Sequence, residues 1–118
     1  MSTRAIAVDV ELQLAPGADP RAPGGAVTVA LCGHWEHDGA CRWPHNNRLD
    51  DSTKPARLRT VTIVDDESLT EVEQRIDTGL RADPRWTVLN LRVGEITDDE
   101  RALAERLTTS ERGRPGSG

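Results

Sequence analysis

The 118-residue chain contains no phenylalanine and no tyrosine, and it has only three tryptophans and one methionine. A hydrophobic core must therefore be built from valine, leucine, isoleucine and alanine, with at most three indole rings. No apolar run approaches the roughly 20 residues that a helix needs to cross a bilayer, so no membrane association is expected. The first ten residues, MSTRAIAVDV, lack the apolar stretch of a secretory signal peptide, and we expect a cytoplasmic protein.

The chain also lacks a net positive charge, because acidic residues outnumber basic ones by 20 to 15, and it has few cysteines. The net charge is −5 and the isoelectric point is near 5.1, whereas a nucleic-acid-binding protein needs a basic surface to displace counterions from phosphate. Nucleic acid is therefore not an expected partner. The chain has two cysteines, and in the cytoplasm these are expected to be thiols or metal ligands rather than a disulfide.

The length of the chain fits one domain with a modest core. We expect a single α+β domain over residues 1–109. A disordered tail is expected over 110–118, because the sequence SERGRPGSG is polar and rich in glycine.

Alternation of apolar and polar residues predicts the first two strands. Residues 4–14 alternate strictly, which predicts a half-buried strand whose inner face carries Ile6, Val8, Val10, Leu12 and Leu14. Residues 15–25 contain three prolines and three glycines and predict a loop. A second strand is predicted to begin at Val27 and to pair antiparallel with the first.

The second half of the chain predicts two strands and two helices. Residues 46–56 are polar and predict a loose loop, and β-branched residues at 57–64 predict a third strand. A strand at 86–93, with Trp86 in the core, and a helix at 97–109 end the domain. Between these strands, helical spacing predicts a helix whose apolar stripe consists of Leu69, Val72, Ile76 and Leu80.

Both predicted helices begin with a capping box, in which two side chains satisfy backbone N–H groups of the first turn. The pairs are Ser68 with Glu71, and Thr97 with Glu100. Acidic residues beside them favour the positive end of the helix dipole. We therefore interpret these acids as structural rather than as metal ligands.

The predicted element order is β-β-(hairpin extension)-β-α-β-α. This order indicates an α+β fold, a two-layer sandwich with a mixed sheet and two helices on one face. The strands at 57–64 and 86–93, with the helix between them, form a candidate βαβ unit.

One stretch concentrates the residues that can carry chemistry. Residues 32–45, CGHWEHDGACRWPH, contain both cysteines, all three histidines and two of the three tryptophans. Asp38-Gly39 is typical of a two-residue hairpin turn. With that turn, opposed residues share a face, and His37 and Trp35 lie on one face. The other face would carry Cys32, His34, Glu36, Cys41, Trp43 and His45.

Thiolates and imidazoles are the ligands that zinc prefers. A regular ladder would separate Cys32 from Cys41 by about 13 Å along the strands, too far for one ion to bind both. Two partial sets then remain, Cys32–His34–His45 and His34–Glu36–Cys41. We predict a small accessory or binding module that holds zinc through the first set, with Cys41 as fourth ligand if the hairpin is irregular.

Two other functions fit the same stretch. A metal-free interaction or homodimerisation domain would use Trp35 and Trp43 as anchors, with Glu36 and His37 beside them, because tryptophan dominates binding hot spots. A small hydrolase would use His34 next to Glu36 as a general base. A half-exposed structural hairpin without a ligand is also compatible with these residues.

Overall fold

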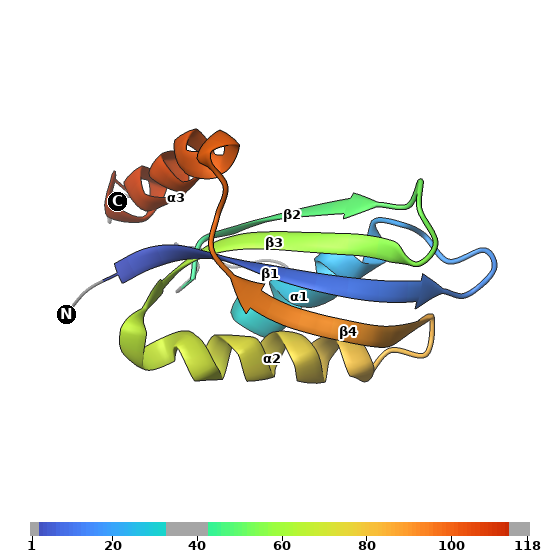
Figure 1. The fold of residues 1–118 in the computed structure, drawn as a ribbon. Coiled ribbons are helices and arrows are strands. Elements are labelled where there is room, and N and C mark those ends of the chain that lie inside the picture. The colour runs from blue at the N-terminus through green and yellow to red at the C-terminus, as the bar shows by residue number, and fades with distance from the viewer. Residues whose placement is uncertain (1–2, 33–42, 114–118) are drawn as a thin grey trace.

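A four-stranded sheet with helices on both faces forms the fold (Figure 1). The structure is a computed structural model, and it describes residues 3–32 and 43–113, with side chains for 3–31 and 43–108. Short 3₁₀ turns at Asp66–Ser68 and Asp98–Glu100 precede the last two helices. In chain order the strands and helices are β1 (Thr3–Leu14), α1 (Ala22–Cys32), β2 (His45–Asp50), β3 (Ala56–Asp65), α2 (Leu69–Arg81), β4 (Trp86–Gly94) and α3 (Arg101–Gly113).

The strand order in the sheet is β2-β3-β1-β4, and each neighbouring pair is antiparallel. The predicted α+β sandwich is confirmed, but the predicted mixed sheet is wrong, because every hydrogen-bonded pair in the described chain is antiparallel. β3 and β4 run parallel to one another with β1 between them, so the predicted βαβ unit is split by an inserted strand. This β-α-β-β-α-β arrangement is called ferredoxin-like, and it supports many unrelated functions.

The alternating sequence of β1 explains its central position. Asp9 and Glu11 lie on the face away from α1 and α2. Trp86, the first residue of β4, is also buried, as predicted. The period of two is confirmed by Ile6, Val8, Val10 and Leu12, which are buried on one face of β1; Ala7, on the opposite face, is buried as well.

Residues 22–32 form helix α1, and the predicted strand beginning at Val27 is wrong. Val27 and Leu31 are 0% and 2% exposed, whereas Val29 is 42% exposed. Residues four apart share one face of a helix, so Val27 and Leu31 enter the core together. Burial of these side chains outweighs the weak helix propensity of a segment rich in glycine and valine.

Residues 45–50 form strand β2, although most of this segment was predicted to be a loose loop. β2 pairs with β3 at the edge of the sheet, through registers such as His45 with Thr62 and Asn47 with Thr60. Its inner face is mostly polar, so it lacks the apolar alternation that identifies other strands. The observed order is therefore β-α-β-β-α-β-α, which corrects the predicted order.

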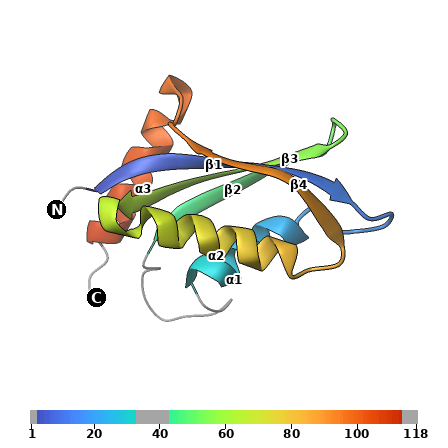
Figure 2. The same cartoon turned by 60° about the horizontal axis from the view of Figure 1, so that its bottom comes forward.

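The helices lie in two layers, with α1 and α2 on one face of the sheet and α3 on the other (Figures 1 and 2). The prediction that the helices at 69–81 and 97–109 share a face is therefore wrong, and the helix that lies beside α2 is α1, which was not predicted. The apolar stripe of α2 is confirmed, because Val72, Ile76 and Leu80 are buried. Helix α3 continues to Gly113, beyond the predicted end at 109.

The two predicted capping boxes have different outcomes. Ser68 makes no cap hydrogen bond, and Glu71 pairs with Arg75 instead, so the first box is wrong. The preceding 3₁₀ turn already places Ser68 in a helical conformation. The second box, between Thr97 and Glu100, is confirmed.

An ion-pair network fastens the start of α3 to the sheet. Arg59 of β3 donates from Nε and Nη2 to the two carboxylate oxygens of Glu100, at 2.6 and 2.7 Å, and from Nη1 to Asp9 at 2.7 Å. Glu100 also accepts the backbone N–H of Thr97 at 2.9 Å. The hydrogen bond from Arg59 is the main cause that lowers the pKa of Glu100 from 4.5 to about 2. The same contact raises the pKa of Arg59.

We expect Glu100→Gln to lower the free energy of unfolding at pH 7 by about 2 kcal/mol, because Arg59 loses a charged acceptor. A carboxylate with a lowered folded pKa stabilises the protein above its unfolded pKa, and this contribution is lost as the pH falls through the folded value. Between pH 4.5 and about 2 the wild type should therefore lose stability more steeply than the variant in urea titrations. Asp98→Asn removes the exposed partner of Arg101 and is the control; equal losses in both variants would contradict the role of Glu100.

Candidate functional site

The candidate site lies where the end of α1 meets the start of β2. Cys32 is the last residue of α1 and His45 is the first residue of β2. The predicted turn at 38–39 lies outside the described residues. So do five of the predicted site residues, namely His34, Trp35, Glu36, His37 and Cys41.

The structure changes how Cys32 and His45 are related. The predicted hairpin placed them opposite one another in a β-ladder, but Cys32 is helical and His45 pairs with Thr62 of β3. Helix α1 packs against β2. The two element ends are therefore neighbours through helix–sheet packing and not through strand pairing.

Both ring nitrogens of His45 lie within hydrogen-bond distance of polar atoms. Nδ1 lies 2.9 Å from the carbonyl oxygen of Trp43, which can only accept, so Nδ1 carries a hydrogen. Nε2 lies 3.0 Å from the hydroxyl oxygen of Thr28 on α1. In the neutral ring Nε2 is then the acceptor, and its lone pair points toward α1. An Nδ1–H bond to a carbonyl is a common way of orienting a metal-binding imidazole.

Asn47 extends this contact into a polar seam, which consists of Thr28, His45, Asn47 and Thr60. The amide nitrogen of Asn47 donates to the carbonyl of Gly24 at 3.0 Å and to Thr28 Oγ1 at 3.3 Å. Its amide oxygen accepts the hydroxyl of Thr60 at 2.7 Å. A Cβ at Gly24 would lie 3.2 Å from the Cβ of Asn47, so glycine permits this close approach of helix and strand.

Trp43 is 2% exposed and belongs to the core. The guanidinium of Arg75 on α2 lies 5.1 Å from the centre of its ring. Arg75 also donates to the carbonyl of Ala30, in the last turn of α1, at 3.3 Å, and it is held by Glu71 at 2.9 Å. One side chain thus contacts both chain segments that flank residues 33–42.

The helix register places the Cys32 position near His45. Cys32 follows Thr28 by four residues, and residues four apart lie on the same side of a helix, about one turn or 5.4 Å apart along its axis. Thr28 is the residue that contacts Nε2 of His45. Two of the predicted ligand positions therefore lie at the same end of the fold.

A metal ion in a protein needs three or four ligands. Among residues 3–31 and 43–108, no three or more histidine, cysteine, aspartate or glutamate side chains lie close enough together to hold one metal ion. Here the described residues supply one oriented imidazole, that of His45. The remaining donors of a metal site at this end would have to come from Cys32 and from residues 33–42.

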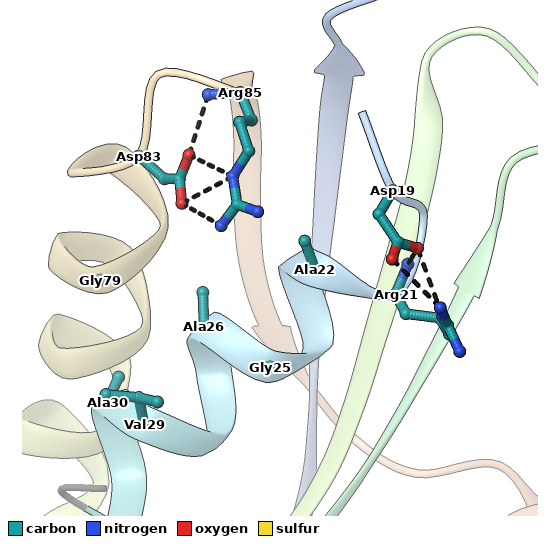
Figure 3. Close-up of a pocket in the computed structure, with 10 residues that line it drawn as sticks. All are labelled: Asp19, Arg21, Ala22, Gly25, Ala26, Val29, Ala30, Gly79, Asp83 and Arg85. Atoms are coloured by element: carbon teal, nitrogen blue, oxygen red, sulfur yellow. Dashed lines mark hydrogen bonds and ion pairs between the residues drawn. The ribbon is translucent and has the colours of Figure 1, made fainter. Parts of the chain in front are cut away.

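A groove of about 730 Å³ lies along α1 beside the end of α2 (Figure 3). The helices approach closely here, since a Cβ on Gly79 would lie 3.0 Å from the Cβ of Ala30. Asp83 and Arg85 form an ion pair at its edge, at 2.6 Å. The hydrogen bond from Arg85 lowers the pKa of Asp83 to about 2, so this carboxylate is ionised at neutral pH and unsuited to proton transfer.

Sequence reasoning missed the polar seam and the contacts of Arg75. The alternation of His45, Asn47 and Leu49 was a signal for β2, but two of these residues are polar and resemble a loop. Arg75 follows Glu71 by four residues, a spacing that usually indicates a surface ion pair on a helix. Its contact with Trp43 depends on chain segments that are distant in the sequence.

No protein-family model and no curated protein matches this chain. Within the part of the chain that the structure describes, no helix is long and apolar enough to cross a membrane.

We expect Asn47→Ala to lower the free energy of unfolding by about 2–3 kcal/mol, because Gly24 and Thr60 lose a hydrogen-bond partner in a partly buried interface. Asn46→Ala is a matched control, since Asn46 is the exposed neighbour on the opposite face of β2. It should change stability by less than about 0.5 kcal/mol. Chemical denaturation of both variants measures the difference, and similar losses would show that the seam is not a major contribution.

Proposed function

We propose that this protein is a small cytoplasmic module that binds zinc at the α1–β2 end of the fold. The ligands would be Cys32, His34 and His45, with Cys41 as the fourth. The observation that carries the proposal is the orientation of His45, whose Nδ1–H is held by the carbonyl of Trp43. Nε2 is then the atom that would bind the ion, as in other metal-binding histidines.

The packing on both sides of residues 33–42 supports the same proposal. Arg75 contacts Trp43 and the last turn of α1, and the polar seam fixes the start of β2. Ligands carried on packed elements lose little conformational freedom when they bind an ion. Thiolate and imidazole donors favour zinc over calcium or magnesium, which prefer oxygen.

The alternative functions have less support. Burial of Trp43 leaves a metal-free interaction domain without one of its two proposed anchors, although Trp35, Glu36 and His37 keep their place in that hypothesis. His34 and Glu36, which a hydrolase would use, lie outside the described residues. An accessory module of this kind would act on a protein partner or a second copy of the chain, and not on nucleic acid or a membrane.

We expect the full chain, purified without added metal or affinity histidines, to contain about one zinc ion per molecule by elemental analysis. The double variant Cys32→Ser/His34→Ala should lose it, because a thiolate and an imidazole are removed together. His37→Ala is the matched control, since this histidine is in the same segment but is not a proposed ligand. Absence of metal from the wild type, with folding unchanged in a chelator, would reject the proposal.

Zinc and Thr28 would compete for Nε2 of His45. We therefore expect Thr28→Val to bind zinc about fivefold more tightly, because the ion no longer displaces a hydroxyl worth about 1 kcal/mol. Thr60→Val is the control, because it removes a hydroxyl that bonds to Asn47 and not to His45. Competition with a chromogenic chelator measures both affinities. Weaker zinc binding by Thr28→Val would mean that the hydroxyl orients His45 rather than competing with the metal.

A further inference from the structure

The face of the sheet opposite α1 and α2 contains a hollow of about 670 Å³ beside the start of α3. Two rows of cross-strand partners line it, and directly opposed residues share a face. In the strand order β2-β3-β1-β4, the first row consists of Arg48, Arg59, Asp9 and Arg92. The second row consists of Asp50, Arg57, Glu11 and Asn90. All four strands therefore contribute to one charged surface.

Arg59 forms hydrogen bonds with the two carboxylates nearest to the first row, those of Asp9 and Glu100. Both oxygens of Asp9 lie 2.7–2.8 Å from its Nη1, and both oxygens of Glu100 lie 2.6–2.7 Å from its Nε and Nη2. Arg92 lies opposite Asp9 but makes no side-chain hydrogen bond or ion pair within the described residues. Arg48 reaches Glu100 only at 4.0 Å. These two guanidinium groups therefore keep donors that no carboxylate occupies at hydrogen-bond distance.

The second row contains another guanidinium group, that of Arg57, whose N–H donors no carboxylate of the described residues occupies. Arg57 lies opposite both Asp50 and Glu11, yet it also makes no side-chain hydrogen bond or ion pair in the described chain. Asp50 instead accepts the hydroxyl and the backbone N–H of Ser52, which lower the pKa of its carboxyl. With Glu100, four carboxylates lie around the four guanidinium groups of the hollow, and three of these carboxylates, those of Asp9, Asp50 and Glu100, are already hydrogen-bonded.

We propose that this hollow binds a small, multiply charged anion with carboxylate or phosphate groups, through Arg48, Arg57 and Arg92. Guanidinium groups recognise both kinds of anion through paired N–H donors. Asn90 can donate to or accept from a neutral part of the ligand. Arg59, fixed by two carboxylates, keeps the floor of the hollow rigid, and the volume is that of a small-molecule site.

A small ligand fits these observations better than a polymer. The whole chain has a net charge of −5, which repels an extended polyanion at long range. The lining of the hollow contains no aromatic side chain on which a nucleic acid base would stack. This anion site lies on the other face of the sheet from the proposed zinc site and does not depend on it.

Titration calorimetry of the full chain with inorganic phosphate and with succinate, at constant ionic strength, tests the proposal. We expect saturable binding of at least one anion, weakened at least about tenfold by Arg57→Gln/Arg92→Gln, because several charge-assisted hydrogen bonds are lost. Selective binding of phosphate would identify a phosphate ligand, and selective binding of succinate would identify a carboxylate ligand. Binding of both anions would support a site whose guanidinium groups recognise either a phosphate or a carboxylate.

The control is the double variant Arg21→Gln/Arg81→Gln. It removes the same charge from two exposed arginines that pair with Asp19 and Asp77 and do not line the hollow. It should bind the anion as the wild type does. Failure of both anions to saturate the protein, or an equal loss of affinity in the two double variants, would overturn the proposal.

Discussion

Burial of one face of β1 is the constraint on which the rest of the structure depends. Because β1 is central and its side chains alternate, its apolar residues must face α1 and α2, and Asp9 and Glu11 must face the other way. The register gives β3 the same two faces, so Thr60 points toward α1 and α2 and Arg59 points away from them. A slip of one residue would turn Asp9 into the core, where an unpaired carboxylate is strongly unfavourable.

The polar seam under α1 is the second consequence of this division. A helix packed on an edge strand usually buries apolar side chains, but β2 presents His45 and Asn47 to α1 instead. Buried polar atoms stabilise a fold only when each has a partner, and here Thr28 and Thr60 supply the partners. The seam therefore fixes where α1 lies along β2, because a shift of the helix would break several hydrogen bonds at once.

The sequence predicted the elements whose stabilising pattern is local. β1 and α2 follow from periodicity, β3 follows from its β-branched residues, and the Thr97–Glu100 box follows from spacing. Helix α1 was missed because Val27 and Leu31 fit a strand or a helix equally well, and only packing decides between them. β2 was missed because its inner face is polar. At the candidate site, composition singled out Cys32 and His45, which lie at one end of the fold. The Nε2 partner of His45 is Thr28 of α1, whose position no local pattern encodes.

The polar seam beside the proposed zinc site and the proposed anion site lie on opposite faces of the same sheet, so their residues can be altered independently. On β3, Thr60 and Thr62 point toward α1 and α2, and Arg57 and Arg59 point toward the opposite face of the sheet. Side chains on opposite faces share no partner here, and the effects of distant, unconnected substitutions usually add. Coupling between the sites would have to pass through the register of β3, which β1 and β2 fix from both edges. One sheet thus carries two chemically different surfaces, one with the polar seam around His45 and one with guanidinium groups.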